Sequence, residues 1–317
     1  MRIAFMGTRD IAVPALHALV TADRPDWQVV GVVTQPDRPA GRSGRPTASP
    51  VKSIAQAAGI PVLQPESWRD DAALQALAET APDVGVVASY AQLLPRRVLR
   101  LPAAGWLNIH PSLLPRHRGP SPVAASILAG DTVTGVTIIK LTLAMDAGPV
   151  VKQVVVPVKP DDTATTLTAR LGDLGAQLLL TILDGWVAGH ITAQPQDITA
   201  ATYSRLLSRQ DGLLDWTLPA GELERRVRAY DPWPGAFTFH RGRRLSILRV
   251  SALPTPANAL PGTVLGTQAV AEQTALRIAT GDRVLAVYRL QLEGRRALDA
   301  EEFVRGQGGI IGMRLGT

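Results

Sequence analysis

The segment WLNIHPSLLPRHRGPSP, residues 106–122, joins a strand-like apolar run to an unusually rigid continuation. The run, residues 106–110, contains two polar residues, Asn108 and His110. Because side chains two positions apart in a strand point to the same face, these two project side by side. Five of the seventeen residues are proline or glycine, and each proline fixes φ and removes a backbone donor. The segment therefore predicts two polar groups at the end of a buried strand, beside a turn rigid enough to form one wall of a site.

The Asn108–His110 pair has chemistry that an active site can use. In an open α/β sheet, ligands bind beyond the carboxyl ends of the parallel strands. At such a place an amide N–H and an imidazole together stabilise a developing oxyanion, and the imidazole also moves a proton. The alternative is a core pair that only satisfies its own hydrogen bonds. The prolines at 111, 115, 120 and 122 favour the site, because an ordinary loop needs no such rigidity.

Asp146 is the expected third member of this site. Its segment LTLAMDAGPVV, residues 141–151, follows an apolar strand pattern and leads into Ala-Gly-Pro, which is a turn signal. A carboxylate at the end of the next strand would face His110, raise the basicity of the imidazole and relay protons. A turn aspartate that bonds only the nearby backbone is the alternative.

The first part of the chain alternates strand and helix patterns. Strand-like runs occupy residues 2–7, 29–34, 84–89, 106–110 and 136–142, and helical patterns occupy 70–80, 121–130 and 163–189. Short, nearly continuous apolar runs suit strands that are buried on both faces. The alternation predicts an α/β, Rossmann-like domain with a mainly parallel sheet over residues 1–189. Its first strand-to-helix turn, FMGTRDIAVPAL, has one glycine, Gly7, where a dinucleotide-binding turn needs three, so nicotinamide and flavin binding is not expected.

The rest of the chain has a different character. Residues 190–208 are polar and lack apolar periodicity, which predicts a linker. One helical pattern, 220–231, then precedes five short strand patterns, 236–241, 244–252, 262–267, 275–280 and 284–293, and a closing helix at 299–306. Regular spacing with glycine and proline turns predicts a second domain, residues 209–317, built as a small β-barrel or a sandwich. Of the two we expect the barrel, of an OB-like kind.

The composition excludes several classes of site. The sequence has no cysteine, which excludes disulfides, thiolate metal sites and cysteine nucleophiles. Its five histidines are scattered, so no metal is expected. No apolar run reaches the roughly 18 residues of a membrane span, and the opening MRIAFMG lacks the layout of a signal peptide. We expect a cytoplasmic protein that is a monomer.

The charge distribution favours a polyanionic partner. The formal net charge is +6 and the isoelectric point is near 10.1. Residues 209–317 hold 15 arginines against 11 acidic residues, many of them in the cluster Arg225, Arg226, Arg228, Arg241, Arg243, Arg244 and Arg249. The segment TQPDRPAGRSGRPTASPVKS, residues 34–53, carries four cations and one acid. Nucleic acid is the partner that such basic stretches suit, and plain solvated surface is the alternative.

These motifs together resemble a known family. The stretch LNIHPSLLPRHRG, followed by Asp146 in MDAGP, resembles the folate-dependent formyltransferases. The resemblance implies that Asn108, His110 and Asp146 are the catalytic residues and that 10-formyltetrahydrofolate is the formyl donor. It also implies a folate site, formed by Ser112, Leu113, Leu114 and Pro115 of the SLLP segment and by Ser89, Tyr90 and Gln92 of ASYAQLLP, residues 88–95.

Further stretches extend the resemblance over about residues 1–315. They include TQPDRPAGR, SPVKSIAQAAGIPVLQP, ILAGDTVTGVTI, ATYSRLL, DGLLDW, AYDPWPGAF and AEEFVRG, in this order along the chain. The pattern is similar to the members of the family that formylate methionine on initiator tRNA for the start of translation. It implies that the oxyanion is held by Asn108 and His110, and that the basic loop grips the tRNA acceptor end through Arg42, with Arg38 and Arg45 beside it.

Three alternatives remain at this point. A formyltransferase that acts on a small amine, such as an amino sugar nucleotide, disagrees with the whole-length match and the basic second domain. An RNA-binding protein with a catalytically dead α/β domain disagrees with the intact Asn108, His110 and Asp146. A nicotinamide oxidoreductase disagrees with the missing glycines of the first turn.

Overall fold

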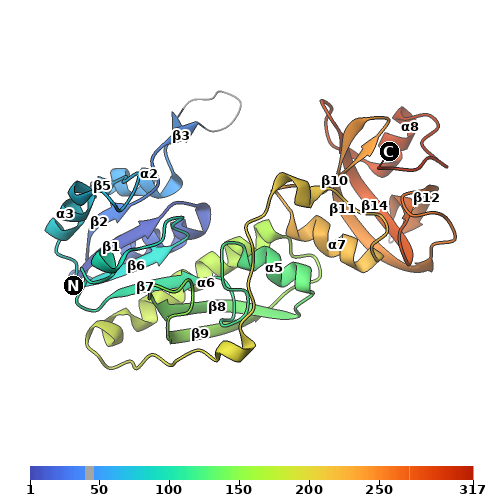
Figure 1. Cartoon of the computed structure of the whole chain (residues 1–317). Coiled ribbons are helices and arrows are strands. Elements are labelled where there is room, and N and C mark those ends of the chain that lie inside the picture. The colour runs from blue at the N-terminus through green and yellow to red at the C-terminus, as the bar shows by residue number, and fades with distance from the viewer. Residues whose placement is uncertain (40–45, 271, 317) are drawn as a thin grey trace. The chain divides into compact units, whose positions relative to one another are not determined.

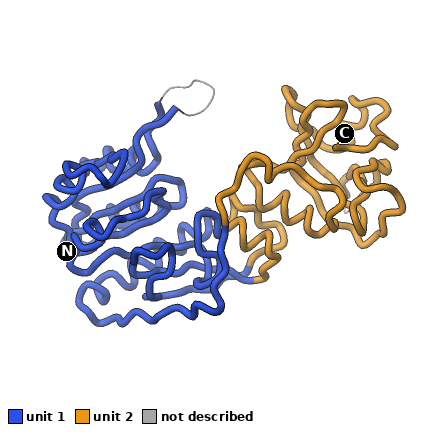
Figure 2. Tube along the Cα trace, in the orientation of Figure 1, with its two compact units in different colours: residues 1–122, 133–157, 168–204 blue, residues 123–132, 158–167, 205–317 orange. Residues whose placement is uncertain are grey.

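The computed structural model describes residues 1–39, 46–270 and 272–316, which form two compact units. Unit 1, blue in Figure 2, comprises residues 1–122, 133–157 and 168–204, and unit 2, orange, comprises 123–132, 158–167 and 205–317. The boundary between Ser204 and Arg205 falls inside the segment predicted as a linker.

Unit 1 is built on a seven-stranded sheet with the strand order β5-β2-β1-β6-β7-β8-β9 (Figure 1). Its strands are β1 (Arg2–Gly7), β2 (Gln28–Val33), β5 (Val62–Leu63), β6 (Val84–Ala88), β7 (Trp106–His110), β8 (Val133–Lys140) and β9 (Val150–Pro157). The first five strands along this order are parallel to one another, whereas β8 runs antiparallel to β7 and β9 antiparallel to β8. The predicted α/β fold with a mainly parallel sheet is therefore confirmed.

The direction of β8 corrects one expectation. The run 136–142, which is apolar except for Thr137, Lys140 and Thr142, suits a strand of a parallel sheet covered on both faces. Strand β8 is indeed buried on both faces along most of its length, yet it is antiparallel to β7. Burial on both faces dictates the apolar run, but it does not dictate direction.

Helices and short elements complete unit 1. They are η1 (Asp10–Ala12), α1 (Val13–Thr21), α2 (Pro50–Ala57), α3 (Asp71–Glu79), α4 (Arg96–Leu99), most of α6 (Ala164–Val187) and η2 (Ile198–Ala200), with the small antiparallel pair β3 (Arg38–Pro39) and β4 (Pro46–Thr47). Ser49 and Asp70 cap α2 and α3, because each side chain accepts a backbone N–H of the first turn.

Strands β6 and β7 pack with little spare room. The indole N–H of Trp106 donates to the carbonyl of Val98 at 2.9 Å, and the ring is almost fully buried. A Cβ added to Gly85, on the neighbouring strand, would lie 2.0 Å from that ring. A glycine is therefore required here by the close approach of the tryptophan, and the contact fixes how β7 lies beside β6.

Unit 2 contains an antiparallel sheet with the order β10-β11-β14-β13-β12, and β15 pairs with β14. Its elements are α5 (Pro122–Ala129), η3 (Arg209–Gly212), α7 (Ala220–Ala229), β10 (Phe237–His240), β11 (Arg243–Pro256), β12 (Val264–Val270), β13 (Gln273–Ala279), β14 (Arg283–Leu292), β15 (Leu298–Asp299) and α8 (Ala300–Gly306). The predicted C-terminal domain of β-strands is confirmed as an antiparallel sheet domain, and each predicted strand and helix of this region overlaps an observed one.

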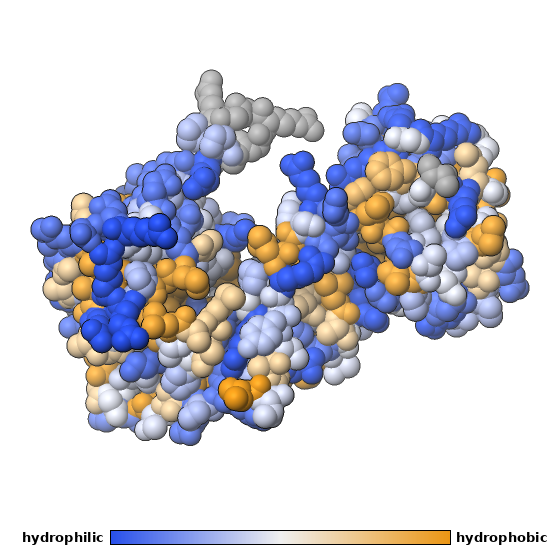
Figure 3. Space-filling view, in the orientation of Figure 1, coloured by the Kyte–Doolittle hydropathy of each residue, from blue (hydrophilic) through white to orange (hydrophobic). Residues whose placement is uncertain are grey.

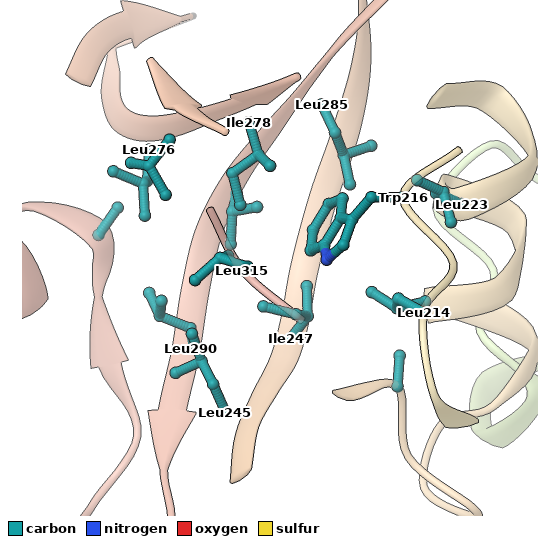
Figure 4. Close-up of a cluster of buried hydrophobic side chains, with 14 of the residues drawn as sticks. Leu214, Trp216, Leu223, Leu245, Ile247, Leu276, Ile278, Leu285, Leu290 and Leu315 are labelled. Carbon is teal, nitrogen blue, oxygen red and sulfur yellow. The ribbon is translucent and has the colours of Figure 1, made fainter. Parts of the chain in front are cut away.

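The core of unit 2 lies between the sheet and α7 (Figure 4). Trp216 lies in it beside Leu285 and Leu223, and its indole N–H donates to the hydroxyl of Thr238 at 3.1 Å. Leu276, Leu285 and Leu290 on the strands are fully buried, as is Leu223 on the helix. The burial of these side chains gives unit 2 a hydrophobic core of its own.

The surface alternates hydrophilic areas with smaller apolar ones on the face drawn in Figure 3. The described residues include no helix that is long and apolar enough to span a membrane.

Candidate active site

Asn108 and His110 occupy the last part of β7, where the sequence predicted them. On one side Asn108 pairs with Ile139 of the antiparallel β8, and on the other β7 runs parallel to β6. Both polar residues are buried, with exposed fractions of 9% and 4%. Their side chains therefore lie in a protected environment, in which electrostatic interactions are stronger than in water.

Asp146 lies against both of these side chains. Its Oδ1 atom is 3.4 Å from the Asn108 amide nitrogen, which donates to it, and 3.6 Å from Nδ1 of His110. Its Oδ2 atom accepts the backbone N–H of Gly119 at 2.7 Å. The three residues singled out in the sequence are thus brought together around one carboxylate oxygen.

The route by which Asp146 reaches the other two differs from the expected one. Because β8 is antiparallel, its last residue, Lys140, pairs with Leu107 near the start of β7. The nine residues 141–149 then lead Asp146 back to Asn108 and His110 before β9 begins at Val150. Asp146 itself adopts a φ of 51°, in the left-handed region that few residues other than glycine enter.

The surroundings of His110 define which of its ring nitrogens carries a proton. Its Nε2 atom lies 3.1 Å from the carbonyl oxygen of His117, which can only accept, so Nε2 carries a hydrogen. Burial lowers the pKa of His110, and the negative charge of Asp146 opposes that shift without cancelling it. The ring is therefore neutral near pH 7, and the lone pair on Nδ1 faces Asp146.

The turn after β7 is held by polar side chains of the next two strands. The hydroxyl of Thr137 on β8 donates to the carbonyl of Ser112 at 2.6 Å and accepts the N–H of Leu114 at 3.1 Å. The amide of Gln153 on β9 donates both to the Leu114 carbonyl, at 2.7 Å, and to the Thr137 hydroxyl, at 2.8 Å. The Ser112 hydroxyl donates to the carbonyl of Arg116 at 2.7 Å. The rigidity predicted from the prolines is therefore reinforced by hydrogen bonds, and sequence reasoning missed Thr137 and Gln153.

The segment 88–95, expected to line a folate site, follows β6. Ser89 has a φ of 50°, and burial raises the pKa of Tyr90 to about 12. The Tyr90 hydroxyl is buried and makes no hydrogen bond of good geometry within the described part of the chain, although the Trp68 side chain close to it opposes the rise in pKa. Gln92 donates to the carbonyl of Pro65 at 3.0 Å, and the next residue, Leu93, is 74% exposed. The segment thus offers an unpaired polar group and an uncovered apolar side chain.

Residues 196–204 bind the loops of the site, although this segment was predicted as part of a linker. We call these residues the site strap. Thr202 accepts the N–H of Arg118 through its carbonyl, at 2.9 Å, and the N–H of His117 through its hydroxyl, at 2.9 Å. The N–H of Ser204 donates to the carbonyl of Arg118 at 2.7 Å. Gln196 bonds both Arg118 and the Asp146 loop. A segment without a long helix or strand has no apolar period, which is why the sequence did not reveal these contacts.

The basic loop is described only at its base. Arg42 and Arg45 lie outside the described residues, and Arg38 is an exposed residue of β3, 3.5 Å from Glu66. Lys52 donates to Asp37 at 2.6 Å and to Gln64 at 2.8 Å. Lys52 therefore fixes the base of the loop.

The arginine cluster of unit 2 divides into two groups. Arg225 and Arg228 donate to the carbonyls of Leu128 and Asp162, and Arg226 pairs with Glu222 one turn earlier in α7. In the sheet, the guanidinium of Arg244 lies 4.0 Å from the ring centre of Phe237, whereas Arg241, Arg243 and Arg249 are exposed. The first group holds unit 2 together, and the exposed group is the one available to an anionic ligand.

Within the described ranges no group of three or more histidine and acidic side chains has the arrangement of a metal site. The polar groups that the described residues bring together at the site are an amide donor, a neutral imidazole and a carboxylate.

Comparisons with known proteins identify the family of the chain. Residues 1–183 match the family model described as formyl transferase, and residues 206–308 match that of the formyl transferase C-terminal domain. The methionyl-tRNA formyltransferase of Roseiflexus castenholzii is 50% identical over 317 residues, covering 100% of this chain and 99% of that protein. The methionyl-tRNA formyltransferase of Thermus thermophilus is 44% identical over 318 residues, covering 100% and 99%.

Solved structures share the fold at lower identity. A sugar 3N-formyl transferase, WlaRD, crystallised with dTDP and 5-N-formyl-THF, has a TM-score of 0.64 at 15% identity, covering 93% of this chain and 99% of that one. HypX from Aquifex aeolicus in complex with tetrahydrofolic acid has a TM-score of 0.63 at 18% identity, and this chain spans about half of it, 48%. The chain therefore belongs to the formyltransferase family, among relatives that carry the name methionyl-tRNA formyltransferase.

Proposed function

We propose that this protein transfers the formyl group of 10-formyltetrahydrofolate to the α-amino group of methionine on initiator tRNA. The observation that carries the proposal is the convergence of Asn108, His110 and Asp146 around one carboxylate oxygen, in a chain related over its whole length to methionyl-tRNA formyltransferases. An amide donor, a base and a carboxylate are the groups that attack of an amine on a formyl carbon needs.

The residues around the site fit a folate donor. A folate presents ring faces that apolar side chains can contact and ring edges with hydrogen-bonding groups, and its 10-formyl derivative supplies an activated formyl group. Leu93, Leu143 and Met145 are apolar and more than half exposed, and they belong to the loops that follow β6 and precede Asp146. The buried Tyr90 hydroxyl, which makes no hydrogen bond of good geometry among the described residues, offers a polar contact. Ser112, Leu113, Leu114 and Pro115, with Ser89 and Gln92, complete the proposed folate site.

Asn108 and His110 divide the chemical work. The Asn108 amide donates to the oxygen of the formyl group as negative charge develops there, a contribution worth about 3–4 kcal/mol in other acyl-transfer sites. Nδ1 of His110 accepts the proton that the attacking amine loses, since Nε2 is already committed to the His117 carbonyl. The imidazolium that results is stabilised by Asp146 and becomes a donor to the oxyanion and then to the leaving nitrogen.

The cations on both units suit a tRNA acceptor. Arg42, with Arg38 and Arg45, is proposed to contact the phosphates of the acceptor end, and the exposed arginines of unit 2 are proposed to contact the tRNA backbone. An amino sugar nucleotide carries only one diphosphate and would need few of these cations. Transfer to an amino sugar nucleotide is therefore the weaker assignment, although a solved sugar formyl transferase shares the fold.

A competition between acceptors tests this proposal. Purified protein would be given 10-formyltetrahydrofolate with a labelled formyl group and, in separate reactions, methionyl initiator tRNA, uncharged initiator tRNA or a dTDP-amino sugar. We expect label on the methionyl initiator tRNA alone. When the tRNA is limiting, we expect the Arg42→Ala variant to transfer less label than the wild-type protein. Label on the amino sugar with none on the tRNA would replace the proposed acceptor.

A further inference from the structure

Gln196 joins the two loops that build the active site. Its side-chain amide nitrogen donates to the carbonyls of Asp146, at 2.8 Å, and Gly148, at 2.7 Å. Its side-chain oxygen accepts two bonds from the guanidinium of Arg118, at 2.7 and 3.1 Å. One amide thus connects the loop that carries Asp146 to the turn that supplies the His117 carbonyl.

The chemistry of its partners fixes which way this amide points. A guanidinium only donates, so the oxygen of Gln196 must face Arg118. Backbone carbonyls only accept, so the NH₂ group must face Asp146 and Gly148. Arg118 is itself 4% exposed and is held by the site strap, since its N–H donates to the carbonyl of Thr202 at 2.9 Å. The amide orientation is therefore set by the fold.

Asp146 needs such support. Its φ of 51° is a conformation that costs on the order of 1–3 kcal/mol for a residue with a side chain, and it persists only where neighbours impose it. The two bonds from Gln196 hold the carbonyls on either side of Ala147, directly at this bend. The Asp146 carboxylate is anchored separately through Gly119, which belongs to the turn that Arg118 and the strap hold.

We infer that Gln196 is a positioning residue for the reaction, which sets Asp146 against His110 and Asn108 by locking the backbone of the Asp146 loop to Arg118. The inference rests on the proposed function, because its effect is exerted on the formyl-transfer step. Gln196 contributes nothing to the reacting atoms directly, and it differs from the trio in acting only through Asp146.

The test uses Gln196→Met, which keeps the length of the side chain and removes all four hydrogen bonds. We expect kcat for formyl transfer to methionyl initiator tRNA to fall about 10- to 100-fold, with KM for tRNA within about twofold, because a misplaced catalytic group costs rate rather than binding. Gln196→Glu is the second variant: it keeps the oxygen that faces Arg118 but loses the donors to the two carbonyls, and we expect the same loss. Gln194→Met is the matched control, since the Gln194 side chain is exposed and its contact with Val150 is made by the backbone.

A double-mutant cycle separates positioning from a general weakening of the fold. In an Asp146→Ala background, Gln196→Met should lower kcat no further, because the group it positions is gone. An additive loss in that background, an unchanged kcat in Gln196→Met, or full activity in Gln196→Glu would overturn the inference.

A second readout does not depend on activity. The imidazole of His110, assigned by NMR with a His110→Gln variant, should titrate at lower pH in Gln196→Met than in Gln194→Met, because Asp146 holds that pKa up. Absence of formyl transfer by the wild-type protein would defeat the proposed function, whereas an unshifted His110 titration would defeat the positioning role.

Discussion

The Nδ1 atom of His110 lies 3.6 Å from Oδ1 of Asp146, and the two side chains are only 5% and 13% exposed. The separation is too long for a direct hydrogen bond but short enough for the carboxylate to stabilise a proton on the ring. Because Nε2 is bonded to the His117 carbonyl, Nδ1 is the only ring position at which a proton is gained or lost. The pair therefore works as a base in the resting state and as a charged donor after it has taken a proton.

The pH dependence of the reaction should follow this pair. Burial lowers the pKa of His110 and Asp146 raises it, so the neutral base is lost only below the usual value of about 6.5. We expect kcat/KM to fall on an acidic limb centred below that pH, and Asp146→Asn to be slower with its limb at still lower pH. Titration of the acceptor amine is common to both proteins and cancels in the comparison. A limb that moves to higher pH in Asp146→Asn would contradict the assignment.

Thr137→Val should weaken the turn after β7. The buried hydroxyl bonds Ser112, Leu114 and Gln153, so its loss leaves buried backbone groups unpaired. Each unpaired buried group costs about 1–3 kcal/mol, so we expect the free energy of unfolding in urea to fall by at least about 1 kcal/mol. KM for the folate donor should rise as well. The exposed Thr192→Val is the control, and equal stability of the two variants would show that the hydroxyl does not hold the turn.

Gly85→Ala should disturb β7 without touching a polar group. The new Cβ would lie 2.0 Å from the Trp106 ring, a distance at which one strand must move. Overpacking of this kind usually costs about 1–3 kcal/mol, which thermal unfolding would detect. Gly306→Ala provides the comparison, because no atom lies within 4 Å of its added Cβ. Unfolding at the same temperature in both variants would argue against the tight β6–β7 packing.

Two arginines of unit 2 should behave differently. Arg228 is partly buried and donates to the Asp162 carbonyl, whereas Arg241 is exposed. Arg228→Met should lower stability by about 1 kcal/mol and leave the salt dependence of tRNA binding unchanged. Arg241→Met should leave stability unchanged and reduce the slope of log affinity against log salt by about one. The reverse pattern would mean that Arg228 contacts the RNA and that Arg241 stabilises the fold.

Much of the architecture follows from local sequence patterns. The runs at 2–7, 84–89 and 106–110 overlap β1, β6 and β7, because strands buried on both faces are mostly apolar. Thr163 precedes α6, and its hydroxyl accepts the N–H of Thr166 at 3.3 Å, as a residue that caps a helix does. Asn108, His110 and Asp146 were recognisable because each is a polar residue at the end of an apolar run or beside a turn signal.

Other features have no local signature. Strand β9 has an alternating, partly exposed pattern at one edge of the sheet, and the nine residues between it and β8 are too few for the crossover that a parallel pair requires. The site strap contacts the active-site loops through backbone groups and single polar side chains. Such contacts depend on which segments the fold brings together, so Gln196 and Thr202 looked like residues of an ordinary polar linker.

The most direct test of the account is the single-turnover rate of formyl transfer to methionyl initiator tRNA at saturating substrates, which isolates the chemical step from product release. His110→Ala, Asn108→Ala and the double variant would be compared with wild type and with the exposed His190→Ala. We predict losses of about 100-fold or more for each single variant, little further loss in the double variant because the residues act as a unit, and wild-type rates for His190→Ala. Rapid transfer by a folded His110→Ala variant would contradict the central claim that this buried imidazole is the base of the reaction.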